Sequence, residues 1–499
     1  MIRIRQVWSQ RVALTAKSNI VVWLISFLFA SPLIAYGISA IGIKAGLAAL
    51  ILFTGLLISI LSLLSSQFGV VFIIASSSFT FIIARIIDAD LPFGVLFEIL
   101  IYITFIGTFF SGRKRLLGLD RADFFSNPFH VAFILWVFYS LIQVFNPNAT
   151  ALDGWLRGLR FLLSTILMYV VFYSAFQSKK YVILFTKVWL VIALLAAIYS
   201  LFQEIFGLPF YDYRWVTKNE LRVGLNWIGG RWRKWSFMAD SSVFGVFMAA
   251  SGVFCIVLSQ GKIQFAKKIV LFLMGIMMLV AMSFSGTRTA YIVVPVGLSI
   301  YILLTIQSRN TKYLIIATIL SLLFILYAPI YNPIFYRIKT AFNPTEDASY
   351  IVREENRAFI RPFIHANPMG GGINTVGTMG LEYSPTHELA GFPPDSQFLH
   401  TALEYGWIGL LLTLVISLVV IILGINNYYK AVDSDIKILY AAYLSFYFAM
   451  TIACYAKNAI FSYPVGFVYT SIHILMHVLF FLQDRESRND ILPREGNDR

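Results

Sequence analysis

Three residues with acid–base side chains come just before an apolar run in the segment FPPDSQFLHTALEYGWIGLL, residues 392–411. They are Asp395, His400 and Glu404, and neighbours in this set are about one and a half helical turns apart or less. Such side chains are suited to moving a proton to or from a hydroxyl group. Asp395 or His400 would be the base, and Glu404 would orient His400 or pair with an arginine. The structural alternatives are a hydrogen-bonded interfacial histidine and an acid that favours a helix start.

The composition indicates a chain that crosses a membrane many times. Of its 499 residues, 59% are hydrophobic and 13% are charged, whereas a soluble domain carries about 25% charged residues. Cationic cytoplasmic loops that orient the spans explain the net charge of +14, so no nucleic-acid partner is expected. The sequence has no P-loop, no dinucleotide-type glycine motif and no Cys/His spacing typical of a metal site.

The apolar runs predict the topology. Runs of about 17–25 residues can cross a bilayer, and about fourteen such runs occur. When they are alternated from a cytoplasmic N-terminus, the loops on the cytoplasmic side carry Lys or Arg, apart from the turn Ser65–Gln67. We therefore predict an all-α polytopic membrane protein with both termini in the cytoplasm. The predicted spans are 20–40, 45–64, 68–88, 91–110, 128–145, 159–177, 181–206, 240–259, 269–285, 288–306, 312–330, 403–425, 435–455 and 461–482.

Two long loops are predicted on the outer face, loop A (206–240) and loop B (331–402). Loops of this length without repeats are often functional. We expect loop B to fold, with a helix over 353–368 and a glycine turn over 369–377. The predicted divisions are N-terminal spans (1–155), central spans with an outer loop at 207–239 (156–330), the large periplasmic loop (331–402), and C-terminal spans with a cytoplasmic tail (403–499).

Loop A places cations beside tryptophans on the face where the orientation rule disfavours them. Arg231, Arg233 and Lys234 stand among Trp227, Trp232 and other aromatic residues. In one interpretation the tryptophans form an interfacial belt and the cations meet lipid headgroups. In the other, the guanidinium groups bind a phosphorylated ligand at the membrane surface.

Further cations occur at the same predicted face. Arg288 lies between two apolar runs, where an arginine is costly without a partner, although it can also snorkel to a headgroup. Ser285 and Thr287 are expected to cap the following helix. Arg160 lies at an outer span end, and Arg361 lies in loop B. A ligand that carries a pyrophosphate on a lipid tail would suit these positions.

The turn Asp88-Ala89-Asp90 is the one Asp-x-Asp sequence predicted on the outer face. It could hold a metal ion, but we interpret it as a polar turn. Arg85 is expected to pair with Asp88 there.

Three pieces of the sequence, in order, resemble the O-antigen ligase and O-antigen polymerase superfamily of bacterial envelope enzymes. They are GGRWRKWSFMADSSVFGVFMA (229–249), SGTRTAYI (285–292), and ENRAFIRPFIHANPMGGGINT followed by DSQFLHTALEYGWIGLL. The resemblance covers about Leu156 to Leu482. It implies a GT-C-like fold with about 14 transmembrane helices and a large folded periplasmic loop.

One departure from the ligase pattern bears on the activity. Ligases have a histidine followed by Asn where this chain has Asp395 followed by Ser396, and His400 is not the equivalent residue. Polymerase-like members tolerate Asp at this place. The resemblance therefore favours a polysaccharide polymerase over a lipopolysaccharide ligase.

The implied reaction is metal-independent glycosyl transfer, without a cofactor, from an undecaprenyl-diphosphate-linked glycan to an acceptor glycan at the outer face of a bacterial inner membrane. A lipid-linked oligosaccharide flippase, a ligase acting on lipid A core and a non-catalytic assembly partner are the alternatives. A chain-length regulator and a flippase are the implied protein partners. Asp395, with His400 as its rival and Glu404 as support, is the expected catalytic group. The expected pyrophosphate ligands are Arg231 and Arg288, with Arg233, Arg160 and Arg361 as secondary candidates.

Overall fold

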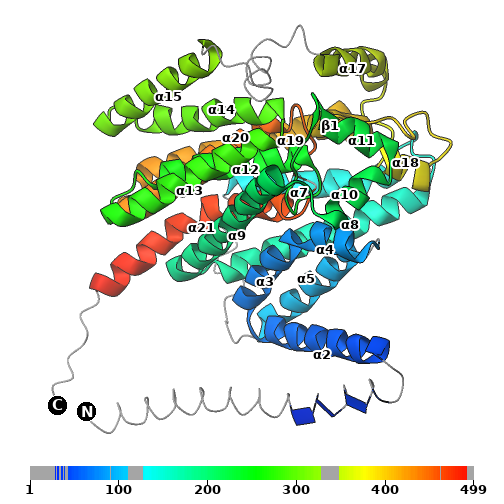
Figure 1. Ribbon diagram of the computed structural model, residues 1–499, viewed down its shortest axis with the longest axis horizontal. Helices are drawn as coiled ribbons and strands as arrows, with labels where there is room; N and C mark the ends of the chain where they lie inside the picture. The colour runs from blue at the N-terminus through cyan, green and yellow to red at the C-terminus, as the bar shows by residue number, and fades with distance from the viewer. Residues whose placement is uncertain are drawn as a thin grey trace.

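The computed structural model describes residues 43–89, 92–110, 127–327, 348–460 and 462–491, together with a few positions between 28 and 39. These residues form helices and one short hairpin (Figure 1). The helices are α2 (Ile43–Leu64), α3 (Ser66–Ser78), α4 (Thr80–Ile87), α5 (Phe93–Phe110), α7 (Pro128–Ile142), η1 (Gln143–Phe145), α8 (Leu152–Ala175), α9 (Lys179–Phe206), α10 (Phe210–Thr217), α11 (Glu220–Asn226), α12 (Ser241–Leu258), α13 (Phe265–Phe284), α14 (Arg288–Leu304), α15 (Arg309–Tyr327), α17 (Ala348–Ala366), α18 (Gly377–Tyr383), α19 (Gln397–Lys430), α20 (Ser434–Ala453) and α21 (Val465–Ile491). The strands are β1 (Trp227–Ile228) and β2 (Arg231–Trp232).

The helices agree with an all-α membrane protein. Seven helices of the described residues are long and apolar enough to cross a membrane, or eight if the bent pair α3 and α4 forms one span. Four shorter apolar helices accompany them. The first predicted span, 20–40, lies largely outside the described residues, so the count of about fourteen spans stays a prediction.

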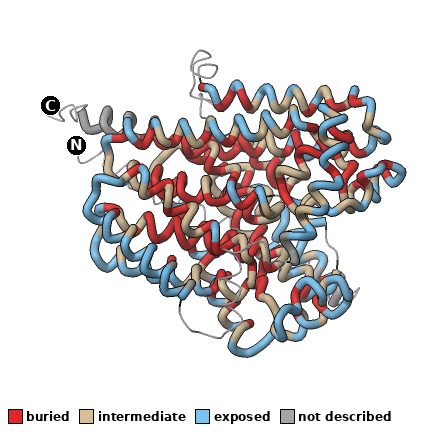
Figure 2. Tube along the Cα trace, turned by 90° about the horizontal axis from the view of Figure 1, so that it is seen from above, coloured by how far each residue is buried: buried red, intermediate tan, exposed pale blue. Residues whose placement is uncertain are grey.

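Helix α12 lies at the centre of the bundle and packs against α13, α14 and α20. Nearly all of its residues are buried, and the buried residues run through the middle of the molecule (Figure 2). Glycines allow this close packing. A Cβ atom on Gly252 would lie 3.0 Å from the carbonyl oxygen of Gly275 on α13, and one on Gly297 of α14 would lie 3.1 Å from the Cβ of Ala449.

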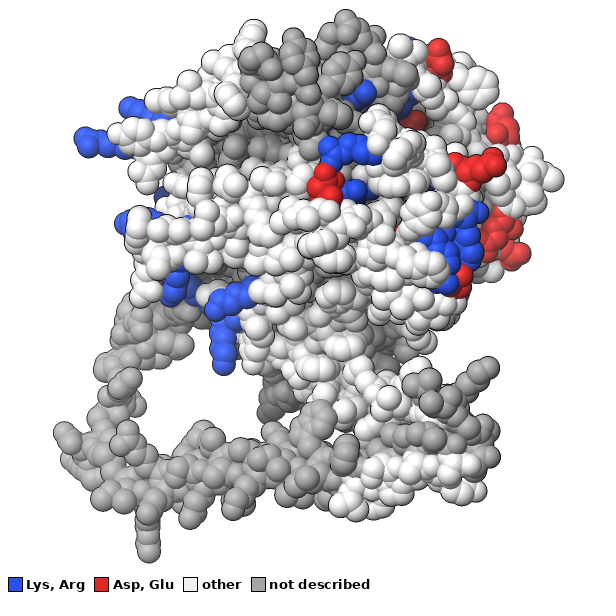
Figure 3. Space-filling model, in the orientation of Figure 1, with Lys and Arg blue, Asp and Glu red and all other residues white. Residues whose placement is uncertain are grey.

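Loop A and the described part of loop B, residues 348–402, lie at one end of the bundle, here named the loop end. Helices α10, α11, α17 and α18 and the hairpin lie toward the right of Figure 1, where α12 and α14 begin. In the face drawn in Figure 3, only Lys and Arg mark the left end, while acidic side chains lie toward the middle and right. On this face, the end opposite the loop end therefore carries cations without acidic side chains.

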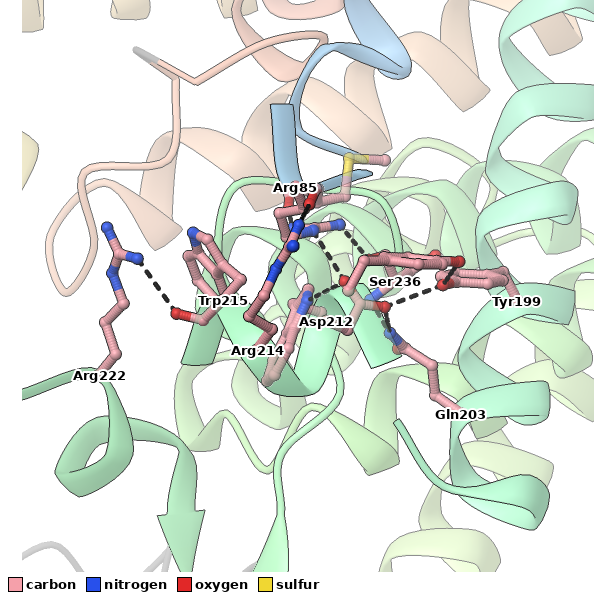
Figure 4. A network of polar contacts seen from close by, with 11 residues as sticks. Arg85, Tyr199, Gln203, Asp212, Arg214, Trp215, Arg222 and Ser236 are labelled. Carbon is pink, nitrogen blue, oxygen red and sulfur yellow. Dashed lines mark hydrogen bonds and ion pairs between the residues drawn. The ribbon is translucent and has the colours of Figure 1, made fainter. Parts of the chain in front are cut away.

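A buried polar network fastens loop A to the bundle (Figure 4). Nε of Arg85 on α4 lies 2.8 Å from Oδ1 of Asp212 on α10, and both side chains are almost fully buried. Tyr199 and Gln203 of α9 each donate a 2.9 Å hydrogen bond to Oδ2 of Asp212. Arg85 also donates to the carbonyl oxygen of Ser236 over 2.7 Å. The network thus joins α4, α9 and both halves of loop A.

The predicted pairing of Arg85 with Asp88 is wrong. Arg85 points into the bundle toward Asp212, whereas Asp88 pairs with Lys218 over 2.7 Å and lies 3.8 Å from Arg214. The sequence could not show this because Asp212 is far away along the chain. Removal of one partner from a buried ion pair leaves an uncompensated charge and costs about 3–5 kcal/mol.

Asp212→Asn is therefore expected to destabilise the protein by about 3–5 kcal/mol, since Arg85 stays buried without its carboxylate. The thermal unfolding temperature of the purified protein in detergent measures this. Asp153→Asn, at an exposed position of α8, is the matched control and should unfold like the wild type. The double variant Arg85→Met/Asp212→Leu should lose less stability than Asp212→Asn. Unfolding of Asp212→Asn at the wild-type temperature would contradict the assignment.

Candidate functional site

Helix α19 breaks at Gly406, within the segment that carries the acid–base residues. Gly406 has φ 69° and ψ −176°, which is not helical. A break of this kind leaves the carbonyl groups before it without partners in the helix. In a protein that spans a bilayer, such groups must find other donors within the protein.

The glycine turn of loop B supplies two of these donors. The backbone N–H of Gly371 donates to the carbonyl oxygen of Leu403 over 2.8 Å, and that of Gly372 donates to Glu404 over 3.0 Å. The hydroxyl of Tyr139 on α7 donates to the carbonyl oxygen of Tyr405 over 2.6 Å. Hydrogen bonds thus connect the break to loop B and to α7.

Only glycine fits at the two closest points of this contact. Gly370 has φ 73°, and a Cβ atom on it would lie 2.5 Å from the backbone nitrogen of Gly406. A Cβ atom on Gly406 would overlap the carbonyl oxygen of Pro368. Both residues combine a left-handed conformation with a close backbone approach. The predicted glycine turn is confirmed, and so is the predicted helix before it, which is α17.

Amide side chains from the segment after α7 donate hydrogen bonds to the carbonyl oxygens of the turn. Gln143 donates to the carbonyl oxygen of Met369 over 3.1 Å, and Asn146 donates to the same oxygen over 3.0 Å. Asn148 donates to the carbonyl oxygen of Gly370 over 3.1 Å. Sequence reasoning gave these amides no role, because no motif links 143–148 to a turn more than two hundred residues later.

Of the three acid–base residues, His400 and Glu404 lie on the first turns of α19, and Asp395 lies just before the helix. Asp395 precedes the N-cap Ser396 and is partly exposed, and Nδ2 of Asn356 on α17 lies 3.4 Å from its Oδ2. Nε2 of His400 lies 3.6 Å from Oε1 of Glu404. Asp395 is therefore the carboxylate of this set that a ligand can reach from the surface.

Glu404 lies deeper, underneath the glycine turn. Its side chain is 4% exposed, and the backbone N–H groups of Asn374 and Val376 face its carboxyl group. Its Oε1 accepts no hydrogen bond from the residues that the structure describes. The arrangement suits Glu404 to positioning His400 rather than to contact with a large ligand.

A second cluster forms where loop A meets the turn before α14. Arg233 donates to the carbonyl oxygen of Ser285 over 2.7 Å and to Oγ1 of Thr287 over 2.9 Å. Its guanidinium group also reaches Oγ of Ser242 over 3.2 Å. Arg233 thereby ties loop A to the N-terminal ends of both α12 and α14.

The expected capping role of Thr287 is wrong in its detail. Thr287 is the N-cap residue of α14, but its side chain makes no cap hydrogen bond. Its hydroxyl donates instead to the carbonyl oxygen of Ser241 over 3.1 Å and accepts from Arg233. Arg288, the next residue, is the first residue of α14 and is partly buried.

Arg231 and Lys234 share the carboxylate of Glu204, at the end of α9. Arg231 forms an ion pair with Oε1, and Nζ of Lys234 lies 3.5 Å from Oε2. Burial lowers the pKa of Lys234 to about 8, and the positive charge of Arg231 acts in the same direction. Two cations facing one acid leave a net positive charge at this point.

The remaining predicted arginines lie outside this cluster. Arg160 pairs with Glu98 of α5 over 3.0 Å, and Arg361 is exposed on α17. The neighbouring Arg357 donates to the hydroxyl of Tyr455 over 2.9 Å and lies 4.4 Å from the centre of its ring. The structure therefore brings together Arg231, Arg233 and the Arg288 turn.

The segment 454–460, after α20, links the two clusters. The carbonyl oxygen of Cys454 accepts hydrogen bonds from the backbone N–H of Gln397, over 3.0 Å, and from Oγ of Ser396, over 3.1 Å. Nζ of Lys457 lies 3.6 Å from Oδ2 of Asp240, which caps α12 with its other oxygen. Sequence reasoning missed Lys457, whose only signal was a cation next to a predicted outer span end.

The turn at 88–90 is only partly described. Asp88 is engaged by Lys218 and Arg214, and Asp90 lies outside the described residues. Within the described part of the chain, no group of three or more His, Cys, Asp or Glu residues could hold a metal ion.

Comparison with known proteins adds one match. A family model described as O-Antigen ligase matches residues 269–414. This range contains Arg288, Arg361, Asp395, His400 and Glu404, whereas loop A lies before it. No curated protein matches the chain. The match confirms the resemblance seen in the sequence.

Gly406→Ala is expected to destabilise the protein by about 3 kcal/mol or more, because the new Cβ atom strains the backbone and displaces Pro368. Thermal unfolding and limited proteolysis of loop B measure the effect. Gly224→Ala is the matched control, since a Cβ atom there meets nothing within 4 Å. Equal stability and equal protease resistance of the two variants would rule out the close contact between Gly406 and loop B.

Proposed function

We propose that this member of the O-antigen ligase and polymerase superfamily is a polysaccharide polymerase. It transfers a glycan from a polyprenyl-diphosphate-linked donor to a hydroxyl group of an acceptor glycan, at the outer face of a bacterial cytoplasmic membrane. The loop end faces outward in this proposal. The cations at the start of α13 (Lys267 and Lys268) and at the start of α15 (Arg309 and Lys312) then face the cytoplasm, in agreement with the positive-inside rule.

One observation carries the proposal: segment 454–460 joins the cation cluster to the acid–base cluster. Lys457 contacts the cap of α12 beside Arg233, and Cys454, three residues earlier, contacts Ser396 beside Asp395. A donor diphosphate on the cations would thus place its sugar toward the carboxylate. Glycosyl transfer needs these two functions next to each other, because the leaving group and the nucleophile act on one carbon.

The proposed step balances without further reactants. The acceptor hydroxyl oxygen forms a bond to the anomeric carbon while the bond from that carbon to the diphosphate oxygen breaks. The electron pair of the broken bond leaves with the polyprenyl diphosphate, whose charge Arg231, Arg233, Arg288 and Lys457 stabilise. The hydroxyl proton moves to the carboxylate of Asp395.

Asp395 is preferred as the base on its position. Asp395 and His400 are both partly exposed, but Asp395 lies before the first residue of α19, whereas Nε2 of His400 lies 3.6 Å from Oε1 of the buried Glu404. The presence of Asp395 at the place of the ligase histidine also favours a polymerase. Arg160 and Arg361 are not part of the proposed diphosphate site. Arg160 pairs with Glu98, and Arg361 is exposed on α17.

Asp395→Asn is expected to lower the transfer rate by about 10²–10⁴-fold with donor binding retained, because it removes only the base. Arg288→Ala should lower the rate by about 10²–10³-fold, because it removes a positive charge that stabilises the leaving diphosphate. Proteoliposomes with a polyprenyl-diphosphate-linked glycan measure both. In the native host the same variants should accumulate single repeat units.

The controls are Asp435→Asn and Arg309→Ala, two exposed positions at the opposite end of the bundle. Both should keep wild-type activity. A fully active Asp395→Asn with an inactive His400→Gln would transfer the base assignment to His400. Glycan that is made but never reaches the outer face would instead indicate a flippase.

Donor affinity is expected to fall several-fold as the pH rises from 7 to 9. Over this range the protonated fraction of a group with a pKa of about 8, such as Lys234, falls from about 90% to about 10%. A diphosphate bound at Arg231, which shares Glu204 with Lys234, favours the charged ammonium of Lys234. Binding therefore takes up a proton and weakens as that proton is lost. Binding of undecaprenyl diphosphate to the protein in nanodiscs measures this. Lys234→Arg and Lys234→Met should both lack the change, and an unchanged wild-type affinity would contradict the role of Lys234.

A further inference from the structure

Loop A exposes large apolar side chains, although its elements are too short to cross a membrane. Phe210 on α10 is 76% exposed, and Leu221 and Leu225 on α11 are 70% and 57% exposed. Trp227 and Ile228 of β1 are also exposed. Single exposed apolar residues are ordinary, but a group of aromatic and aliphatic side chains on one short segment marks an interaction surface.

The buried side of loop A fixes this exposure. Asp212 and Val216, one turn apart on α10, are fully buried, and Trp235 is fully buried after the hairpin. Asp212 is held by the network with Arg85. Because one face of α10 is anchored in this way, the opposite face with Phe210 and Tyr213 is turned permanently away from the bundle.

The exposed surface continues the lipid-facing side of a predicted span. Helix α9 is one of the helices long and apolar enough to cross a membrane. Leu195, Phe202, Ile205 and Phe206 are exposed along its second half, and Phe210 follows after a short turn. Exposed apolar side chains that follow one another along the chain from a span into the next helix are expected to meet the same solvent, which is lipid.

Cations lie next to the aromatic residues of this apolar surface. The guanidinium group of Arg222 lies 4.7 Å from the ring centre of Trp215, and Lys218 pairs with Asp88. Arg231 lies on the hairpin beside Trp232. Aromatic side chains with adjacent cations suit the boundary between acyl chains and anionic headgroups.

We propose that α10, α11 and the hairpin of loop A lie within the surface of the lipid bilayer. Phe210, Leu221, Leu225 and Trp227 enter the acyl boundary, and Arg222 meets the phosphate groups of anionic phospholipids. The inference rests on the exposed surface and its continuity with α9, and it holds whether or not the chain transfers glycans. Its consequence is that Arg231 and Arg233 lie at headgroup depth, level with the phosphate groups of lipids.

Site-directed spin labelling tests this in the full-length protein, reconstituted in liposomes of phosphatidylethanolamine and phosphatidylglycerol. Cys255 and Cys454 are buried, so the wild type gives the background labelling. Labels are placed at Leu221→Cys and Leu225→Cys, with Thr378→Cys on the exposed start of α18 as the matched control. Collisions with oxygen, which concentrates in the bilayer, are compared with collisions with a water-soluble nickel chelate.

Labels at 221 and 225 are expected to collide several-fold more with oxygen than with the nickel chelate, and the label at 378 should show the reverse. If 221 and 225 behave like 378, the surface lies in water and the proposal is overturned. If they are shielded from both reagents, protein covers the surface, and the proposal is overturned as well. Normal thermal unfolding of each labelled variant confirms that the fold is intact.

Discussion

The break in α19 is the constraint on which the rest of the site depends. A helix that enters an apolar environment cannot leave backbone carbonyl groups unpaired, and the break at Gly406 creates such groups at Leu403, Glu404 and Tyr405. Two glycine N–H groups of loop B and the hydroxyl of Tyr139 bond to them. The same contacts that satisfy the backbone therefore dock loop B on the bundle and cover Glu404.

The placement of the remaining groups follows from this docking. Once loop B is held against α19, α17 brings Asn356 next to Asp395, and Arg357 reaches Tyr455 in the segment after α20. That segment also contacts the cap of α12 through Lys457. Loop A reaches the same place independently, because the buried pair of Arg85 and Asp212 fixes its start and Arg233 fixes its end. Two separately anchored loops are thereby brought together at one end of the bundle.

Cations at this end have unequal surroundings, and this separates roles that look alike in the sequence. Arg85 is enclosed by carbonyl and carboxylate oxygens and stabilises the fold. Arg160 is neutralised by Glu98. Arg231 and Lys234 share one acid, so one positive charge remains without an acidic partner there. Arginine at a span end is thus a weak functional signal by itself, and its partners decide whether its charge is available.

The sequence by itself determined the properties that depend on neighbouring residues. Hydropathy over a span length identified most helices of the bundle, the spacing in 353–368 predicted α17, and the run of glycines at 370–372 predicted a turn, because these features arise from local hydrogen bonding and from burial of a whole segment. Only the tertiary structure decided which distant groups meet. The partner of Arg85 is Asp212 and not the nearby Asp88, Thr287 binds Arg233 instead of capping its helix, and the amides at 143–148 hold a turn in loop B. The physical reason is that the residues near a charged or amide side chain in the sequence do not specify its distant partner. Which group becomes the partner depends on how the helices pack.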